Sequence, residues 1–301
     1  MRSCFHIEIT TPKKVVLNGL WFGPYSAKAS KGKPKKPKRV IIFIHGLTAS
    51  AFSMKRVVDA LVDSQTAVVT FNNRGFEKIT EIKRIKGKKK VWVRAGAAHE
   101  VFTECADDIQ GAINFVKKAG VKNVYLAGHS TGCQKAYYWA SKNKKEQNVK
   151  GIILFGPLSD YAIAVEYDKR GKLAKSVAYA RRLVRAGKAH ELMPEKLGMW
   201  FPCDAQRFLS LYSGNSAEEI FTYWDTSKNP RTLKSVRLPI LVMLAGKEEF
   251  SDIPAKQIAS WFNAHLRNGS AVVVPNVGHS FKGGEKIVAR AIGDFVKSTL
   301  N

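Results

Sequence analysis

Residues 124–134 of the chain read VYLAGHSTGCQ. The apolar run Val124–Ala127 predicts a buried strand, and a helix is expected from Thr131 onward. The residues that join them form the pattern G-x-S-x-G, with Ser130 at its centre. The two glycines permit a tight turn that exposes the serine hydroxyl, and the N-terminus of the following helix favours negative charge beside it. We therefore expect Ser130 to be a nucleophile, and the alternative is a serine that only caps the helix.

The rest of the chain alternates strand-like and helix-like segments around this motif. Continuous apolar runs at 40–44, 67–71 and 240–245 predict strands that are buried on both faces. The apolar spacing over 100–118 predicts an amphipathic helix. Segments 5–9 and 15–22 predict an opening hairpin. The sequence thus predicts an α/β fold with a mostly parallel central sheet flanked by helices. Further strands are expected at 152–155 and 271–274, and further helices at 53–61, 173–184, 253–266 and 286–300.

Residues 158–235 interrupt the alternation, because they contain several helical stretches and no strong strand. We expect a core made of residues 1–157 and 236–301, with 158–235 inserted as a helical cap. Ligands of open α/β sheets bind at the carboxyl ends of the strands, so such a cap would cover the site. Seven aromatic residues fall within 200–224. We expect them to pack the cap onto the core, and the alternative is that some line an apolar or aromatic-acid pocket.

A base and an acid for Ser130 are expected in two loops near the C-terminus. His279 follows the strand expected at 271–274 and precedes the last helix, which is the position of a general base. The loop after 240–245 offers three carboxylates, namely Glu248, Glu249 and Asp252. We favour Glu248 because it stands where the loop leaves the strand, and the other two stay open as alternatives.

The loop His45-Gly46-Leu47 follows the first buried strand. The backbone N–H groups of Leu47 and Thr131 are expected to form an oxyanion hole. We interpret His45 as a structural residue of this loop. Arg74, after the next strand, is expected to form a salt bridge rather than to bind a substrate carboxylate. No metal and no organic cofactor is implied by this set of residues.

The chain has 301 residues and a formal net charge of +26. Its hydrophobic share of 45% excludes global disorder. Residues 28–39 and 78–90 together supply 13 of the 26 charges. We expect the first segment to be a loop and the second a loop or a ragged hairpin. Neither segment interleaves aromatic residues with its lysines, so we interpret both as solvated surface and expect no specific nucleic-acid partner. Attraction of anionic ligands or surfaces is the alternative.

The four cysteines show no CxxC spacing, which favours reduced thiols and a cytoplasmic protein. No apolar run approaches the roughly 20 residues of a membrane helix, and no signal peptide is expected. The sequence leaves the oligomeric state open.

Taken together, these motifs resemble the α/β-hydrolase superfamily with a helical cap. More narrowly, they resemble an esterase-like family of once-unknown function that includes fungal siderophore ester hydrolases. The motifs that carry the resemblance are Phe43-Ile44-His45-Gly46, Phe71-Asn72-Asn73-Arg74-Gly75, residues 128–134, Glu191-Leu192-Met193-Pro194, residues 205–212 and Gly278-His279-Ser280-Phe281.

The order Ser130, Glu248, His279 agrees with the chain order of that superfamily. Members of the narrower esterase-like family usually read Gly-x-Asp-Glu-aromatic in the acid loop, where this chain has Gly246-Lys247-Glu248-Glu249-Phe250. The resemblance implies a serine carboxylesterase that acts on a small or medium ester. The alternatives are a thioesterase, a lactonase, a siderophore or aromatic-acid esterase, and a non-catalytic protein that binds an anionic partner.

Overall fold

The computed structural model describes residues 4–24, 36–168 and 171–299. Its strands are β1 (Cys4–Thr10), β2 (Val15–Phe22), β3 (Arg39–Ile44), β4 (Thr66–Phe71), β5 (Thr80–Lys86), β6 (Lys89–Ala95), β7 (Asn123–His129), β8 (Val149–Phe155), β9 (Ile240–Ala245) and β10 (Gly269–Val274). Its α-helices are α1 (Lys55–Leu61), α2 (Cys105–Lys118), α3 (Thr131–Lys142), α4 (Asp160–Tyr167), α5 (Lys172–Arg185), α6 (Ala205–Tyr212), α7 (Arg231–Ser235), α8 (Ala255–His265) and α9 (Glu285–Ser298).

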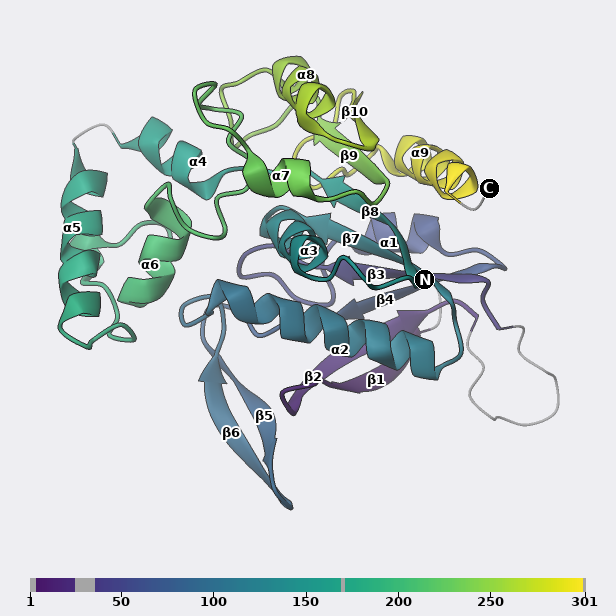
Figure 1. Cartoon of the computed structure of the whole chain (residues 1–301), viewed down its shortest axis with the longest axis horizontal. Helices are drawn as coiled ribbons and strands as arrows, with labels where there is room; N and C mark the ends of the chain where they lie inside the picture. Colours follow the sequence, from purple (N-terminus) through teal and green to yellow (C-terminus); the bar gives the residue numbers. More distant parts are fainter. Residues whose placement is uncertain (1–3, 25–35, 169–170, 300–301) are drawn as a thin grey trace.

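One mixed sheet forms the centre of the molecule (Figure 1). The strand order is β10-β9-β8-β7-β3-β4-β2-β5-β6. In addition, β1 pairs with β2 outside this order. The six strands from β10 to β4 run parallel, whereas β1, β2, β5 and β6 pair antiparallel. The predicted mostly parallel sheet and the predicted opening hairpin are therefore confirmed.

Helices cover both faces of the sheet and create two apolar layers. One layer packs α2, α3 and α8 against the sheet and includes Ile109, Cys133 and Phe262. The other layer packs α1 and α9 against the opposite face and includes Val58 and Val288. Because β3 and β4 are buried from both sides, they consist of nearly continuous β-branched and aromatic residues.

The helical insertion, residues 158–235, lies between β8 and β9. Helices α4, α5 and α6 share a small apolar cluster at one end of the molecule (Figure 1), and this cluster also includes Ala97 and contacts Leu47. Within its described residues the insertion has no strand and only an isolated bridge between Leu192 and Asp204. Six of the seven aromatic residues in 200–224 are buried or half-buried, whereas Trp200 is 50% exposed. Packing therefore accounts for most of this aromatic cluster.

Two local expectations change in the structure. The helix expected from residue 100 begins at Cys105 after a short 3-10 turn, which leaves Glu100 outside it. The segment 78–90 contributes to a regular antiparallel hairpin of β5 and β6, so the loop alternative is wrong. Most of the basic segment 28–39 lies outside the described residues. Among the residues that are described, no helix is long and apolar enough to cross a membrane.

Candidate active site

Ser130 occupies a strained turn between β7 and α3. Its backbone angles are φ 54° and ψ −127°, a conformation that L-residues rarely adopt. Its N–H donates to the carbonyl of Phe155 at 2.9 Å. The side chain makes no capping hydrogen bond to the helix, so the capping alternative is wrong. A Cβ added at Gly132 would collide with the carbonyl oxygen of Ile44, which explains why glycine is required there.

His279 and Glu248 form a pair at the same edge of the sheet. The two residues follow β10 and β9, and these strands run parallel to β7 through β8, so their carboxyl ends meet where Ser130 lies. Glu248 Oε2 accepts from His279 Nδ1 at 2.9 Å, and the side chains are only 7% and 12% exposed. This contact places the proton on Nδ1 and leaves Nε2 as a proton acceptor.

The three acidic residues of the acid loop make different contacts. Glu249 Oε2 accepts from the backbone N–H of His279 at 2.6 Å, so Glu249 holds the loop and not the ring. The backbone N–H of Asp252 lies 3.5 Å from Glu166 Oε2, on the side of helix α4. Of the three, only Glu248 bonds the His279 imidazole.

His129 connects the serine turn to the histidine loop. Its Nε2 donates to the backbone carbonyl of His279 at 2.9 Å, and the two ring centroids lie 4.7 Å apart. Burial, with a smaller effect from the neighbouring His279, lowers the pKa of His129 to about 3, so this ring is neutral. Within the described residues no hydrogen bond joins Ser130 Oγ to the His279 ring. Catalytic hydrogen bonds are often long without substrate and tighten when it binds.

The loop after β3 approaches the serine turn closely. A Cβ added at Gly46 would lie 2.9 Å from Ser130 Cβ. Among the described residues, the N–H groups of Leu47 and Thr131 have no acceptor. His45 holds this loop, since its Nδ1 donates to the carbonyl of Gly46 at 2.9 Å while its Nε2 accepts from the N–H of Asn73 at 3.2 Å. The structure thus brings two free backbone donors to the edge of the sheet where Ser130 lies.

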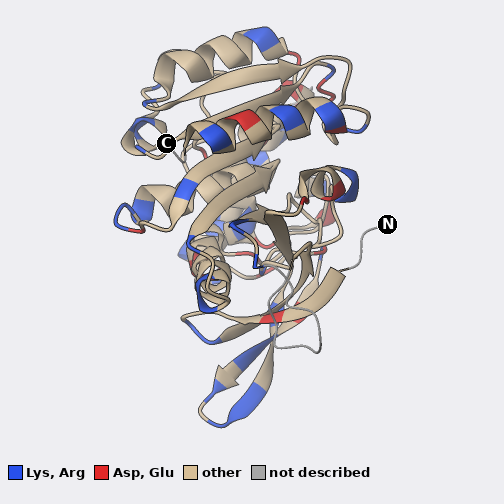
Figure 2. Ribbon diagram, turned by 90° about the vertical axis from the view of Figure 1, so that its right-hand side faces the viewer, with Lys and Arg blue, Asp and Glu red and all other residues tan. Residues whose placement is uncertain are grey.

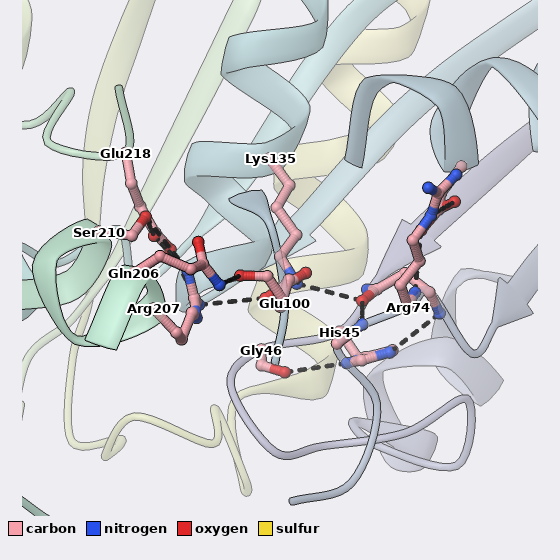
Figure 3. A network of polar contacts seen from close by, with 12 residues as sticks. His45, Gly46, Arg74, Glu100, Lys135, Gln206, Arg207, Ser210 and Glu218 are labelled. Atoms are coloured by element: carbon pink, nitrogen blue, oxygen red, sulfur yellow. Dashed lines mark hydrogen bonds and ion pairs between the residues drawn. The ribbon is translucent and has the colours of Figure 1, made fainter. Parts of the chain in front are cut away.

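A buried ionic network extends from this loop to the helical insertion (Figure 3). Lys135 Nζ, on α3, lies 2.6 Å from Glu100 Oε1 and 3.1 Å from Asn73 Oδ1. Glu100 Oε2 lies 3.1 Å from Arg207 Nη2, on α6, and Arg207 also pairs with Glu218. Burial lowers the pKa of His45 to about 3, and the Lys135 ammonium contributes in the same direction.

The sequence analysis missed this network. The only feature of the sequence that could have indicated it is Lys135, which stands four residues after Thr131 on the buried side of α3. The network links the insertion, helix α3 and the loop that carries Leu47.

The salt bridge expected for Arg74 is confirmed by its contacts. Arg74 pairs with Glu104, Asp107 and Asp108, so its guanidinium is engaged within the protein. Cys133 is buried, and its thiol donates to backbone carbonyls. Burial raises the pKa of this thiol, which disfavours the reactive thiolate. Across the described residues, no group of three or more His, Cys, Asp or Glu side chains is arranged to hold a metal ion.

Comparisons with known proteins agree with this architecture. Residues 99–287 match the model of a family described as "Protein of unknown function (DUF1749)". A search of curated proteins found no match.

Many solved structures are similar along nearly the whole chain. DcsB, solved with a substrate analogue, has a TM-score of 0.67 at 14% identity, covering 99% of both chains. The α/β-hydrolase GrgF from Penicillium sp. sh18 has a TM-score of 0.64 at 14% identity, again over 99% of both chains. Est1E from Butyrivibrio proteoclasticus with ferulic acid has a TM-score of 0.62 at 16% identity, over 98% of this chain and 99% of the other. These similarities show that the chain has the α/β-hydrolase fold.

Proposed function

The chain belongs to the DUF1749 family, and we propose that it is a serine hydrolase that cleaves small to medium carboxylic esters. The observation that carries the proposal is the 2.9 Å contact between Glu248 Oε2 and His279 Nδ1. It lies at the sheet edge where Ser130 stands in its strained turn. A nucleophile on such a turn, with an imidazole oriented by a buried carboxylate, is the arrangement that serine hydrolases require.

In the proposed reaction, Ser130 Oγ attacks the carbonyl carbon of the ester and His279 Nε2 takes the hydroxyl proton. His279 then gives this proton to the leaving alcohol, which departs as the acyl group stays on Ser130. A water molecule, deprotonated by the same Nε2, attacks the acyl-enzyme. His279 then returns this proton to Ser130 Oγ as the acid is released. Glu248 keeps the ring in the required tautomer and stabilises the imidazolium that forms in each half of the reaction.

The negative charge on the carbonyl oxygen is stabilised by the N–H groups of Leu47 and Thr131. Removal of one such donor typically costs about 3 kcal/mol of transition-state stabilisation. His45 positions the Leu47 side of this site through its bond to the Gly46 carbonyl. The helical insertion, residues 158–235, acts as a cap at the carboxyl ends of the strands, where the substrate enters. The described cysteines are free thiols, in keeping with a cytoplasmic protein.

The direct test is hydrolysis of p-nitrophenyl acetate and octanoate by the purified protein and by Ser130→Ala. Ser260→Ala, on the exposed side of α8, is the matched control. We expect turnover to vanish in Ser130→Ala and to persist in the control. A fluorophosphonate probe should label the parent protein at Ser130 and leave the variant unlabelled. If both proteins hydrolyse the esters equally and neither is labelled, the proposal is wrong.

The alternatives concern the leaving group and can be compared on the same protein. An acyl thioester, a lactone and methyl ferulate probe the thioesterase, lactonase and aromatic-acid esterase alternatives. The last is included because Est1E, of the same fold, was solved with ferulic acid. We expect the highest kcat/KM with the simple oxygen esters.

A further inference from the structure

The β5–β6 hairpin projects from the end of the sheet away from the rest of the molecule (Figure 1). In the described part of the chain, it pairs with the sheet at Val15 and Val16 of β2, and the N–H of Ile85 also donates to the carbonyl of Lys14 at 2.8 Å. Among the described strands, β6 pairs with β5 alone. At the tip, Gly87 has a positive φ of 59°, and no atom lies within 4 Å of the position that its Cβ would take. The hairpin is therefore a two-stranded ribbon with much of both faces open to solvent.

The ribbon carries a dense positive charge that the protein itself hardly neutralises (Figure 2). Its tip reads Lys86-Gly87-Lys88-Lys89-Lys90. Within the described residues only Lys90 of the hairpin forms an ion pair, at 3.8 Å from Glu8. Residues 78–95 contain the single acid Glu81 and eight cations, namely Lys78, Lys83, Arg84, Lys86, Lys88, Lys89, Lys90 and Arg94.

An exposed tryptophan stands among these cations. The strand register places Trp92 directly opposite Lys83, and Lys90 and Arg94 lie on the same face of the ribbon. Trp92 is 60% exposed, and Lys83 Nζ lies 4.9 Å from its ring centroid. The basic segment 78–90 ends before Trp92, so only strand pairing reveals which charges share a face with the ring. These are Lys83, Lys90, Arg94 and the acid Glu81, whereas the paired Lys86 and Lys89 lie on the opposite face at the tip. A ring between cations can stack on a nucleobase while the cations contact phosphates.

We propose that the β5–β6 hairpin binds single-stranded nucleic acid without sequence preference, with Trp92 stacked on a base and the tip lysines on phosphates. Strands of seven residues give a ribbon about 24 Å long, enough to follow a few nucleotides. A membrane-inserting loop would carry apolar side chains at its tip, whereas this tip has only lysines and a glycine. The charge complementarity therefore favours a hydrophilic polyanion with exposed bases.

The first experiment measures fluorescence anisotropy of a labelled 20-nucleotide oligothymidylate titrated with the full-length protein at several salt concentrations. The test variant is Lys86→Gln/Lys88→Gln/Lys89→Gln. The matched control, Lys256→Gln/Lys286→Gln/Arg290→Gln, removes three exposed charges from α8 and α9. Each phosphate contact contributes roughly 0.7 to the slope of log K against log salt, so the test variant should lower it by about 2. An equal effect of the control would mean that overall charge alone binds the oligonucleotide, and would overturn the proposal.

The second experiment tests the stacking ring. Trp92→Ala should weaken binding about fivefold or more, the loss expected when one base loses its stacking partner. Trp200→Ala, which removes a tryptophan of similar exposure from the helical insertion, should leave the affinity unchanged. Circular dichroism melts check that all variants fold. Equal affinity for a 20-base-pair duplex, or no effect of Trp92→Ala, would overturn the proposal.

The nucleic-acid proposal is independent of the hydrolase reaction. Ser130→Ala should bind the oligonucleotide as the parent does, so failure of either proposal leaves the other standing. Sedimentation with vesicles of phosphatidylserine and phosphatidylcholine examines the membrane alternative. Capture by vesicles that depends on the tip lysines, without binding of the oligonucleotide, would assign the hairpin to an anionic membrane and overturn the proposal.

Discussion

Lys135 Nζ lies 2.6 Å from Glu100 Oε1, and both side chains are buried. Lys135 projects from the helix that begins at the serine turn, and Glu100 stands outside α2 where the hairpin returns to the core. The Glu100 carboxylate also meets Arg207 of the helical insertion. The pair therefore joins three parts of the chain that surround the candidate site.

Breaking this pair should destabilise the protein strongly. Lys135→Met leaves the buried Glu100 carboxylate without its nearest cation, and loss of one partner of a buried ion pair typically costs about 3–5 kcal/mol. Urea unfolding should show this loss in the single variant. The double variant Lys135→Met/Glu100→Gln should recover part of it, because the unpaired charge is then removed. Strictly additive effects of the two substitutions would contradict the coupling.

Substitutions at the acid candidates Glu248 and Glu249 should differ in their effect on kcat. Glu248→Gln removes the carboxylate that orients His279 and should lower kcat for p-nitrophenyl acetate by on the order of 10³–10⁴. Glu249→Gln is the matched control, since it changes the neighbouring residue, which bonds only the backbone of His279. We expect it to retain most of kcat. A larger loss in Glu249→Gln than in Glu248→Gln would reverse the assignment.

Local sequence order was enough to predict much of this architecture. Ser130, Glu248 and His279 each follow a predicted strand, and parallel strands bring such positions to one edge of the sheet. The ionic network, in contrast, could not be predicted from local sequence. Glu100, Lys135 and Arg207 lie far apart in the chain. Glu100 and Arg207, taken alone, look like ordinary surface charges, and Lys135 differs only in its place on the inward side of α3. Only the packing of the insertion against α3 makes them partners.

The β5–β6 hairpin was also only partly predictable from the sequence. Its charge was evident from the residues, but the position of Trp92 opposite Lys83 depends on register. Register is set by the turn at Gly87 and by pairing to β2, and neither was predicted.

Two buried histidines should make the protein sensitive to acid. Burial lowers the pKa of both His45 and His129 to about 3, below the ordinary value of 6.5. Between pH 6.5 and 3 the unfolded chain therefore binds protons that the native state does not. The free energy of unfolding should fall as the pH decreases, by up to about 1.4 kcal/mol per pH unit for each histidine. Urea titrations at pH 7 and pH 5 should show a smaller loss in His129→Gln than in the parent, and equal losses would contradict the interpretation.

Gly156 should be required for the position of the His279 imidazole. It has a positive φ of 56°, and a Cβ added there would lie 3.0 Å from both Nδ1 and Cε1 of His279 and 3.6 Å from Glu248 Oε2. Gly156→Ala therefore strains the backbone and also pushes the imidazole from its place. A displacement of about 1 Å can cost about a hundredfold in rate, so we expect kcat to fall by that order with little change in KM.

The matched control for this substitution is Gly187→Ala. Gly187 also has a positive φ, of 77°, but no atom lies within 4 Å of its Cβ position. Both variants should lose similar stability, roughly 1–2 kcal/mol, because each forces an L-residue into the left-handed region. Only Gly156→Ala should lose activity, measured as kcat on p-nitrophenyl acetate at a temperature where both variants are folded. Equal kcat values in the two variants would mean that Gly156 serves the turn alone and that the imidazole tolerates a neighbouring methyl group.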